Sequence, residues 1–592
     1  MKKVKFRFVF VALVFLVVLL VPGFAGTSAP VRKVEQWKRI DIELISAKTY
    51  NNPFLDVSID AVFTHTKSGE SVTIPGFWNG DNRWVVRFSP IKPGKWRYVI
   101  KSDDDTNAGL LQKGEILCIK NKGTTELDRR GFVKISDNKR FFTYADGKPF
   151  FWLGDTHWQA PDYERWEVCN DPDCDKSCGN SQFKHLLKNR ISKGFNVFQT
   201  YPDVGDNDGG GNPRRFTWWA DKTKLLHDTQ NICINPKAFN EHFDVMMDYL
   251  AGQGMTIALG FGVHQASADA MSQESMIHWA RYMVARYASY PVIWITAQEI
   301  NARPQTGSYA KWCKVSETIF KLDGYQHPLS AHTDRDYVGK RPSFNEIKDL
   351  PWHGFWAMQG GHGKDNSAEV QTQKYYKKYW NSDHRKPYIE TEANYEQLLW
   401  PTPIPDLKTR QTAWRAIQSG SYGYTYGASG IWAMNWEPND GKGWESYSNL
   451  CWYQAKDLPG SFQMGYMKAF YELLEFEKLE PRFDDTTYVR DIDYNKDFIS
   501  SNGNNFYVLY SSAGTRTGGT FCGLNQSEYY KGVWFNPRTG ERQPPDNHII
   551  PSKDRTYLIP VKPDSNDWVF LLTNTGKTIP NHLRGVNKSD QR

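Results

Sequence analysis

The sequence predicts a (β/α)8 barrel of the TIM type between an N-terminal and a C-terminal β-sandwich domain. Three observations support this α/β prediction. Over residues 126–480, short apolar runs typical of buried strands alternate about eight times with segments of helical periodicity. Residues 30–125 and 481–576 instead show strands and turns without a helical period, as β-sandwiches do. A chain of 592 residues is long enough for three such domains.

The N-terminus has the layout of a secretory signal peptide over residues 1–29. Four basic residues precede an apolar run over 8–21, and small residues around Ala25 and Ala29 follow it. The run is short for a membrane span, although an uncleaved anchor is the alternative. Removing the four basic residues lowers the formal net charge from +7 to +3. We therefore expect a secreted or periplasmic protein that binds no nucleic acid and has no stable membrane insertion after signal cleavage.

Strands of the first sandwich are visible as alternating apolar and polar residues. Leu55–Phe63 alternates with period two, and Trp84–Phe88 and Lys95–Ile100 lie on either side of a turn at Lys92–Gly94. This pattern predicts half-buried strands between residues 34 and 122.

The barrel is predicted from strand and helix segments that follow one another. Ser181 and Asn235 are typical helix caps, and each precedes a segment with apolar residues on one face. An open doubly wound sheet is the alternative, but no glycine-rich phosphate loop follows a strand. The expected strands are Phe150–Leu153, Phe195–Gln199, Met255–Gly260, Val292–Ile295, Pro328–Ala331, Gly354–Met358, Tyr388–Ile389 and Gly430–Met434.

The last part of the chain returns to strands and turns. Asn505–Tyr510 and Asp567–Leu572 are the clearest strands of the second sandwich. A polar tail over 577–592 follows it.

The cysteines suit a protein that leaves the cytoplasm. Cys169, Cys174 and Cys178 cluster in a long insertion after Asp155, and we expect a loop held by a disulfide bond. Neither the spacing nor nearby histidines fit a zinc site. Acidic residues in the cluster leave calcium as a weaker alternative, without the pattern of a known calcium loop. We expect no metal and no cofactor in the active site.

Two glutamates at strand ends are the candidate catalytic pair. Glu299 follows the apolar run Val292–Ile295, and Glu392 follows Tyr388–Ile389. These are the fourth and seventh expected strands, and a barrel keeps its chemistry at the carboxyl ends of its strands. Hydrolysis of a glycosidic bond needs a carboxylic acid that protonates the leaving oxygen and a carboxylate that attacks or activates water. We expect Glu392 to be the nucleophile and Glu299 the acid/base, with a pKa raised by burial or by the neighbouring charge.

Glu390 competes with Glu392 for the role of nucleophile. Strand alternation places both side chains on one face of the sheet. Glu392 is nearer the carboxyl end of the strand, so we expect Glu390 to lie deeper and to support the site.

Polar and aromatic residues at the other strand ends are candidates for holding sugar hydroxyls. They share a position on the catalytic face of the expected barrel, where loops form the site. The substrate-binding candidates are Asp155, His157, Trp158, Gln199, Gln298, Asn301, His332, Gln359, His362 and Trp436.

Several of these segments resemble a known family. The barrel is similar to the apiosidase-like hydrolases, the group related to glycoside hydrolase family 140. Residues 86–96 resemble the small β-sandwich found before such barrels, and residues 534–540 resemble the C-terminal sandwich labelled collagen-binding in collagenases. The matching barrel segments are Tyr144–Thr156, Gly194–Val197, Ala285–Tyr287, Gln359–Gly363, Lys386–Glu392 and Tyr395–Glu396.

The resemblance implies a retaining-type barrel whose two acids, after strands four and seven, map to Glu299 and Glu392. Relatives often have Asp as the first acid or Asn before it, whereas this chain has Gln298 followed by Glu299. This departure and the cysteine-rich insertion mean that apiose specificity is not carried over.

The leading interpretation is therefore a secreted glycoside hydrolase that acts on a plant or algal polysaccharide or oligosaccharide. The alternative is a non-catalytic carbohydrate-binding or adhesion protein on a degenerate barrel, in which replacing either glutamate leaves binding intact. A protease with a collagen-binding module is disfavoured, because the sequence has neither an HExxH motif nor a serine elbow.

Overall fold

The computed structural model describes most of the chain after residue 30. The described residues are 31–202, 232–262, 271–301, 307–333, 344–362, 376–437, 447–503, 505–514, 518–544, 546–576 and 579–583. The predicted signal peptide lies outside them, and the predicted tail is described only at 579–583. Within the described part of the chain, no helix is both long enough and apolar enough to span a bilayer.

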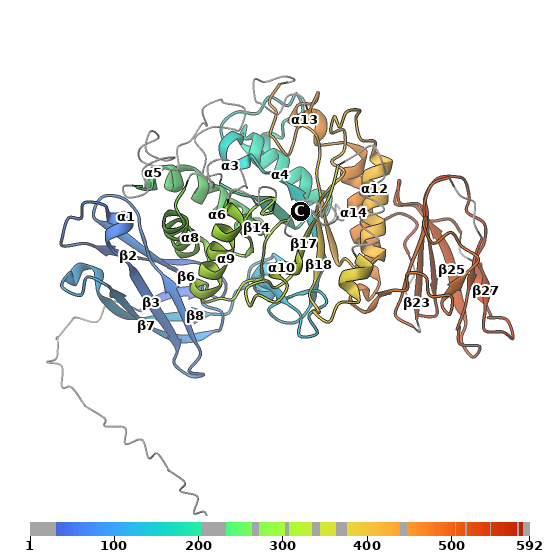
Figure 1. Cartoon of the computed structure of the whole chain (residues 1–592), viewed down its shortest axis with the longest axis horizontal. Helices are drawn as coiled ribbons and strands as arrows, with labels where there is room; N and C mark the ends of the chain where they lie inside the picture. The colour runs from blue at the N-terminus through green and yellow to red at the C-terminus, as the bar shows by residue number, and fades with distance from the viewer. Residues whose placement is uncertain are drawn as a thin grey trace, which may run out of the picture.

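The predicted barrel between two β-sandwiches is confirmed, and Figure 1 shows the three units in a row along the long axis. Eight parallel strands follow one another around the barrel, and the last strand, β19, pairs with the first, β12. Between β16 and β17 the ring is completed by a single bridge from His332 to Ala357. The strands are β12 (Trp152–Thr156), β13 (Val197–Thr200), β14 (Thr256–Gly260), β15 (Val292–Ile295), β16 (Leu329–Ser330), β17 (Trp356–Gly361), β18 (Tyr388–Ala393) and β19 (Gly423–Tyr426).

One predicted strand was wrong. Gly430–Met434 forms turns, and the eighth strand is β19, earlier in the chain. The segment 423–426 alternates aromatic and small residues and is fully buried, whereas Met434 has a positive φ of 51° that no strand adopts.

Helices surround the barrel, and some of them begin at a side chain that caps the first turn. The Ser181 hydroxyl accepts the Lys184 N–H at the start of α4, and the Asn235 side chain accepts the Ala238 N–H before Pro236 opens α5. The longer helical segments are α4 (Gln182–Ser192), α5 (Pro236–Ala238) continuing through a π-helical turn η3 (Phe239–Phe243) into α6 (Asp244–Gly252), α8 (Gln273–Tyr287), α9 (Ser308–Leu322), α12 (Asp406–Gln418) and α14 (Pro459–Leu473).

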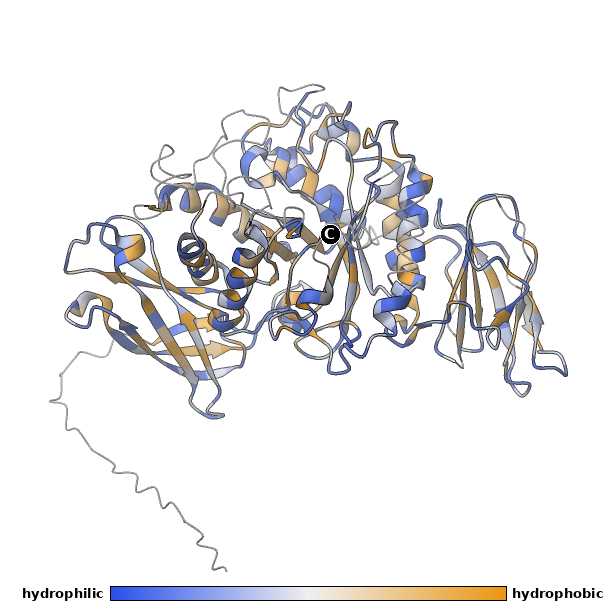
Figure 2. Cartoon of the chain, in the orientation of Figure 1, coloured by the Kyte–Doolittle hydropathy of each residue, from blue (hydrophilic) through white to orange (hydrophobic). Residues whose placement is uncertain are grey.

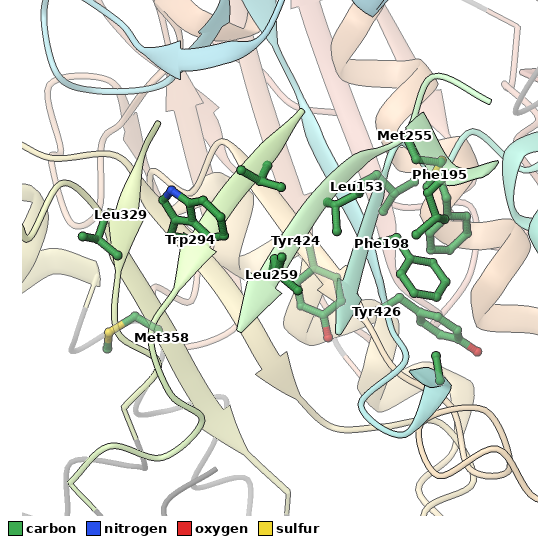
Figure 3. Close-up of a cluster of buried hydrophobic side chains, with 14 of the residues drawn as sticks. Leu153, Phe195, Phe198, Met255, Leu259, Trp294, Leu329, Met358, Tyr424 and Tyr426 are labelled. Carbon is green, nitrogen blue, oxygen red and sulfur yellow. The ribbon is translucent and has the colours of Figure 1, made fainter. Parts of the chain in front are cut away.

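Two hydrophobic layers hold the barrel together. Side chains such as Leu153, Trp294 and Tyr424 belong to the large cluster between strands and helices, part of which Figure 3 shows. A second cluster lies inside the barrel and includes Trp152 and Ile293. Residues of β9 (Val133–Ile135), β10 (Phe142–Tyr144) and β11 (Pro149–Phe150) join this inner cluster, so the small sheet closes the end of the barrel opposite the strand carboxyl ends.

The N-terminal domain is a sandwich of two sheets, in which Phe63 of one stacks on Phe88 of the other at 3.9 Å. Figure 2 shows hydrophobic residues along the strands of both sandwich domains. The first sheet has the order β1 (Arg32–Glu35), β8 (Gln112–Ile119), β7 (Gly94–Ser102), β3 (Ile59–His65) and β4 (Ser71–Pro75), and the second has β2 (Ile40–Ile45), β6 (Arg83–Phe88) and β5 (Phe77–Trp78).

The C-terminal domain also has two sheets, with their own buried cluster. The larger sheet packs on α12, where Tyr510 stacks on Trp414 with an interplanar angle of 6°. Its order is β20 (Glu480–Pro481), β22 (Asp497–Ser501), β23 (Phe506–Ser511), β28 (Trp568–Thr573), β25 (Tyr530–Phe535) and β26 (Asp546–Ile549), and the smaller sheet has β21 (Val489–Arg490), β24 (Thr520–Phe521) and β27 (Tyr557–Leu558).

Candidate active site

Glu392 lies near the carboxyl end of β18, the seventh barrel strand, and is almost completely buried. One oxygen, Oε2, accepts hydrogen bonds from Gln298 Nε2 at 3.0 Å and from Trp158 Nε1 at 3.2 Å. The other, Oε1, lies 3.1 Å from both Gln359 Nε2 and His362 Nε2. A carboxylate that accepts so many hydrogen bonds is stabilised in its ionised form.

Two histidines beside Glu392 are oriented by backbone N–H groups. His332 Nδ1 accepts the Glu299 N–H at 3.4 Å, and His362 Nδ1 accepts the Tyr395 N–H at 3.3 Å. Each ring therefore carries its proton on Nε2, and each Nε2 faces Glu392, at 3.5 Å from His332 and 3.1 Å from His362.

The pKa of Glu392 is far below its ordinary value. Burial alone would raise the pKa, but the hydrogen bond from His362, the charges that His332 and His362 can carry, and the bond from Gln298 lower it to about 2. Burial lowers the pKa of His332 to about 4, so this ring is neutral at pH 7. Hydrogen bonds, rather than an ion pair with His332, therefore stabilise the Glu392 carboxylate at neutral pH.

Glu299 lies in the loop after β15, the fourth strand, and is half-buried. Its φ of 50° is in the left-handed region, which is uncommon and costly for a residue with a side chain. The bond from its N–H to His332, at the end of the next strand, supports this conformation.

Gln359 connects the two glutamates. Its Nε2 donates to Glu299 Oε1 at 2.9 Å and to Glu392 Oε1 at 3.1 Å. Since both oxygens lie within these distances of one nitrogen, they are at most about 6 Å apart, the sum of the two distances. The structure thus brings together six candidates named from the sequence around Glu392, namely Glu299, Gln298, Trp158, His332, Gln359 and His362.

Glu390 has different partners from Glu392. A register shift of β18 against β17 at Thr391 interrupts the regular alternation that we expected, and Glu390 bonds to Tyr376 and to backbone N–H groups. Burial raises its pKa to about 8, so it is protonated at neutral pH.

Four other candidates lie away from the two glutamates or are occupied by bonds within the protein. Asp155 Oδ2 accepts from Arg190 Nε at 2.5 Å and lies 2.8 Å from His157 Nε2, in a buried charge cluster under the β12 loop. Gln199 donates to the Thr391 carbonyl and accepts from Thr425 inside the barrel. Trp436 Nε1 donates to the Tyr163 carbonyl.

Asn301 is buried in the loop that carries Glu299. Two further residues were absent from the sequence-based candidates. Tyr395 accepts the Trp158 indole N–H at 3.0 Å, and its position three residues after Glu392 was a usable signal. Tyr376 donates to Glu390 from a helical turn at 376–380, and nothing in its sequence context points to the site.

The cysteine-rich insertion is closed by a disulfide bond between Cys169 and Cys174. The Asn170 side chain inside this loop donates to the Trp436 carbonyl at 3.0 Å. Asp171 lies 3.0 Å from His185 and 3.2 Å from Lys456, and Asp175 lies 2.6 Å from Lys188, so other side chains already bond to two of the acids that calcium would need. In the described part of the chain, no cluster of three or more histidine, cysteine or acidic residues could hold a metal ion.

The comparison with known families decides the assignment. The family described as apiosidase-like, catalytic domain, matches residues 136–478, more than half of the chain and the whole of the barrel. The chain belongs to the apiosidase-like family. Its barrel is accordingly the catalytic domain of a glycoside hydrolase, and its substrate is a carbohydrate.

The two flanking domains of this apiosidase-like protein also match family descriptions. Residues 33–103 match a domain of unknown function, and residues 487–573 match a "putative collagen-binding domain of a collagenase". No curated protein matches the chain.

Solved structures share the architecture of the apiosidase-like chain. A "putative glycoside hydrolase" from Bacteroides vulgatus ATCC 8482 has a TM-score of 0.66 and 19% identity, over 92% of this chain and 100% of that one. A glycoside hydrolase family 5 structure from the same organism has a TM-score of 0.59 and 18% identity, over 78% and 98% of the two chains. At such identities the likeness supports the fold.

Proposed function

We propose that this protein hydrolyses a glycosidic bond in a plant or algal polysaccharide with retention of configuration, with Glu392 as nucleophile and Glu299 as general acid/base. The observation that carries the proposal is the Gln359 amide, which donates to one oxygen of each glutamate. Carboxyl groups about 5–5.5 Å apart are typical of retaining enzymes, whereas inverting enzymes leave about 6.5–9.5 Å for a water. The upper limit of about 6 Å between the two oxygens therefore favours retention.

The electrostatics of the pair suit two different roles. Glu392 stays ionised because four side chains donate to it and its pKa is about 2, so it is available to attack the anomeric carbon. Glu299 is half-buried close to that negative charge, and a neighbouring carboxylate favours the protonated form of an acid.

The reaction then proceeds in two displacements. In the first, Glu299 gives its proton to the leaving oxygen while Glu392 forms a bond to the anomeric carbon and the glycosidic bond breaks. In the second, the Glu299 carboxylate takes a proton from water, whose oxygen bonds to the anomeric carbon and releases Glu392. Each residue ends in its starting protonation state.

Aromatic side chains pack together beside Glu392. Trp158 donates to its carboxylate and lies 5.4 Å from Tyr201, and the partly exposed Trp432 lies 6.3 Å from Tyr395, measured between ring centroids. Of these rings, the partly exposed Trp432 is the one suited to pack on the apolar face of a sugar ring.

We place the protein outside the cytoplasm as part of the same proposal. The leader over residues 1–29 has the composition of a signal peptide. The Cys169–Cys174 disulfide bond is consistent with an oxidising compartment. Expression in a bacterial host with export machinery, followed by fractionation and N-terminal sequencing, should give a periplasmic or secreted protein that begins near residue 30. A full-length protein retained in the membrane would contradict export.

The test of the activity is reducing-sugar release from pectic, arabinoxylan and sulfated algal polysaccharides. Wild type should release sugar from one class, and Glu392→Gln and Glu299→Gln should each lose about 10³-fold or more of the rate, because each removes a group that acts in the transition state. Glu396→Gln is the matched control, since Glu396 is a buried glutamate that accepts from Tyr426 and the Gly460 N–H away from the pair.

Azide separates the two roles. In Glu299→Ala, azide needs no general base and should restore turnover of an activated glycoside with a product of retained configuration. In Glu392→Ala, azide should enter directly and give the inverted product. Full release by Glu392→Gln would contradict the nucleophile assignment, and binding of a glycan without any release by wild type would favour the adhesion alternative.

A further inference from the structure

The pairing of β17 with β18 is irregular where the two strands reach the active site. Met358 lies opposite Glu390, Gln359 opposite Glu392, and Gly361 opposite Ala393. Thr391 is therefore an extra residue on β18, and Gly360 is an extra residue on β17. Such bulges occur next to active sites, where they redirect a side chain and leave backbone groups without a ladder partner.

Side chains on β18 bond to the backbone groups at these bulges. Glu390 Oε1 accepts the Gly360 N–H at 2.8 Å and the Glu392 N–H at 3.3 Å. The Thr391 hydroxyl donates to the Met358 carbonyl at 2.7 Å. One carboxyl group thus joins the backbone of β17 to the backbone of the candidate nucleophile itself.

Glu390 is held firmly in this position. Its Oε2 accepts the Tyr376 hydroxyl at 3.1 Å, and the residue is only 1% exposed. A methyl group added at Gly360 would lie 2.9 Å from Glu390 Oε2 and 3.1 Å from the Ala393 Cβ. Glycine at 360 is therefore the residue that allows the carboxyl group to lie against the strand.

The residue before Gly360 is Gln359, whose amide donates to both glutamates of the site. A side chain that bonds to one acceptor in the loop after β15 and to another on β18 can keep both bonds only while its own backbone stays in place. The bond from the Gly360 N–H to Glu390 holds the backbone next to Gln359. The bond from the Glu392 N–H to the same Glu390 oxygen holds the backbone of Glu392, one of the two acceptors of Gln359.

We infer that Glu390 is a positioning residue that holds the β17 bulge, so that Gln359 can orient Glu299 and Glu392 for catalysis. This inference deepens the proposed function and rests on it. Glu390 acts through backbone N–H groups and does not touch the substrate, which separates its role from that of the two catalytic carboxyls.

Glu390 performs this role in its neutral form. Burial raises its pKa to about 8, against the hydrogen bonds from Gly360, Glu392 and Tyr376. The titratable groups that face it are Tyr376 from the helical turn, Tyr424 from β19 and Glu392 from its own strand. Glutamine has the same shape as the neutral acid, and its amide oxygen can accept the same two N–H groups. Glu390→Gln is therefore the conservative variant.

The experiment compares Glu390→Ala and Glu390→Gln with wild type. In Glu390→Ala we expect kcat to fall about 100-fold with little change in KM, as a displacement of about 1 Å in a catalytic group can cause. In Glu390→Gln we expect kcat within about 5-fold of wild type. The double variant with Gln359→Ala should be no slower than Gln359→Ala alone, because both changes remove the same orientation.

A control variant and crystal structures separate positioning by Glu390 from a purely structural role. Glu396→Ala removes another buried glutamate that accepts a backbone N–H, so a purely structural role for Glu390 predicts equal losses of Tm and unchanged kcat in both variants. Crystal structures of Glu390→Ala and Glu390→Gln test the positioning even if wild type hydrolyses no glycoside, which would overturn the proposed function alone. The inference is supported if Gln359 Nε2 leaves Glu299 or Glu392 only in the alanine variant, and it is overturned if both bonds persist there or if kcat is unchanged.

Discussion

The ionisation of Glu392 depends on single neighbouring side chains, and His362 contributes the largest of the effects that oppose burial. Its Nε2 proton points at Glu392 Oε1, and its Nδ1 is occupied by the Tyr395 N–H. A nucleophile held at a pKa of about 2 is ionised throughout the mildly acidic and neutral range. Loss of a donor therefore affects the pH at which activity begins.

Replacing His362 by alanine should move the acid limb of the kcat/KM profile to higher pH. A hydrogen bond to a charged group contributes about 1.5–3 kcal/mol, and about 1.4 kcal/mol corresponds to one pKa unit, so we expect a shift of one to two units. The sign follows from the lowered pKa: the reactive carboxylate is present above the pKa of Glu392 and is lost as pH falls through it. The profile is measured on a soluble glycoside from pH 9 down to about pH 2, so that the wild-type limb near the Glu392 pKa of about 2 is included.

His185→Ala is the control for this prediction, because His185 is paired with Asp171 beside the disulfide loop. Its acid limb should coincide with that of wild type. An unchanged acid limb in His362→Ala would mean that Glu392 does not need His362 to remain ionised.

At the scale of elements, the bulged end of β17 has little room for an added methyl group at Gly360. Gly360→Ala should lower kcat about 10-fold or more, because the methyl meets Glu390 Oε2 at 2.9 Å in a site where Tyr376 restrains that oxygen. The control is Gly252→Ala at the end of α6, where an added Cβ meets nothing within 4 Å. Steady-state kinetics of the two purified variants give kcat for each. Equal kcat values would show that β17 accommodates the methyl group without moving the site.

The sequence predicted the elements better than it predicted their ends. Seven of the strand segments could be located because short apolar runs such as Val292–Ile295 are buried on both faces. The eighth was misplaced because Gly430–Met434 is equally apolar but lies in turns. Trp436 was proposed as a sugar contact on the basis of that false strand, and it lies instead beside the disulfide loop.

The sequence predicted which residues lie at the strand ends, but it did not predict the hydrogen bonds between them. Gln359 and His362 were named because they follow the sixth strand, but their bonds to Glu392 depend on the paired bulges at Gly360 and Thr391. Nothing in strand periodicity reports a bulge, since one extra residue leaves the local composition unchanged. The bulge at Thr391 also explains why Glu390 and Glu392 have different hydrogen-bond partners.

At the scale of the whole molecule, buried ion pairs join each sandwich to the barrel. Arg87 of the N-terminal sandwich and Arg286 of α8 both bond to Asp244, at 2.5 and 2.7 Å. On the other side, Arg410 of α12 makes two bonds to Asp567 of the C-terminal sandwich, at 2.7 and 2.8 Å. All of these side chains are at least nine-tenths buried. Removing one partner of such a pair leaves a buried charge and lowers the free energy of unfolding strongly, so these pairs matter for holding the domains together.

Asp567→Ala should uncouple the C-terminal sandwich from the barrel. The change removes two bonds of the buried Arg410 guanidinium and the acceptor of the Tyr510 hydroxyl, and it leaves partly exposed Asp406 as the carboxylate partner of Arg410. Because one carboxylate remains, we expect a cost of about 3 kcal/mol, the lower end of the range for a broken buried pair. Asp484→Ala is the matched control, because Asp484 pairs with Lys377 across the same two domains but both side chains are largely exposed, and such a pair contributes about 0–1 kcal/mol. Differential scanning calorimetry should resolve a separate, earlier transition in Asp567→Ala, with proteolytic release of the C-terminal domain, while Asp484→Ala behaves as wild type. Equal effects of the two changes would mean that apolar packing, such as the stack of Trp414 on Tyr510, is what holds the domain to the barrel.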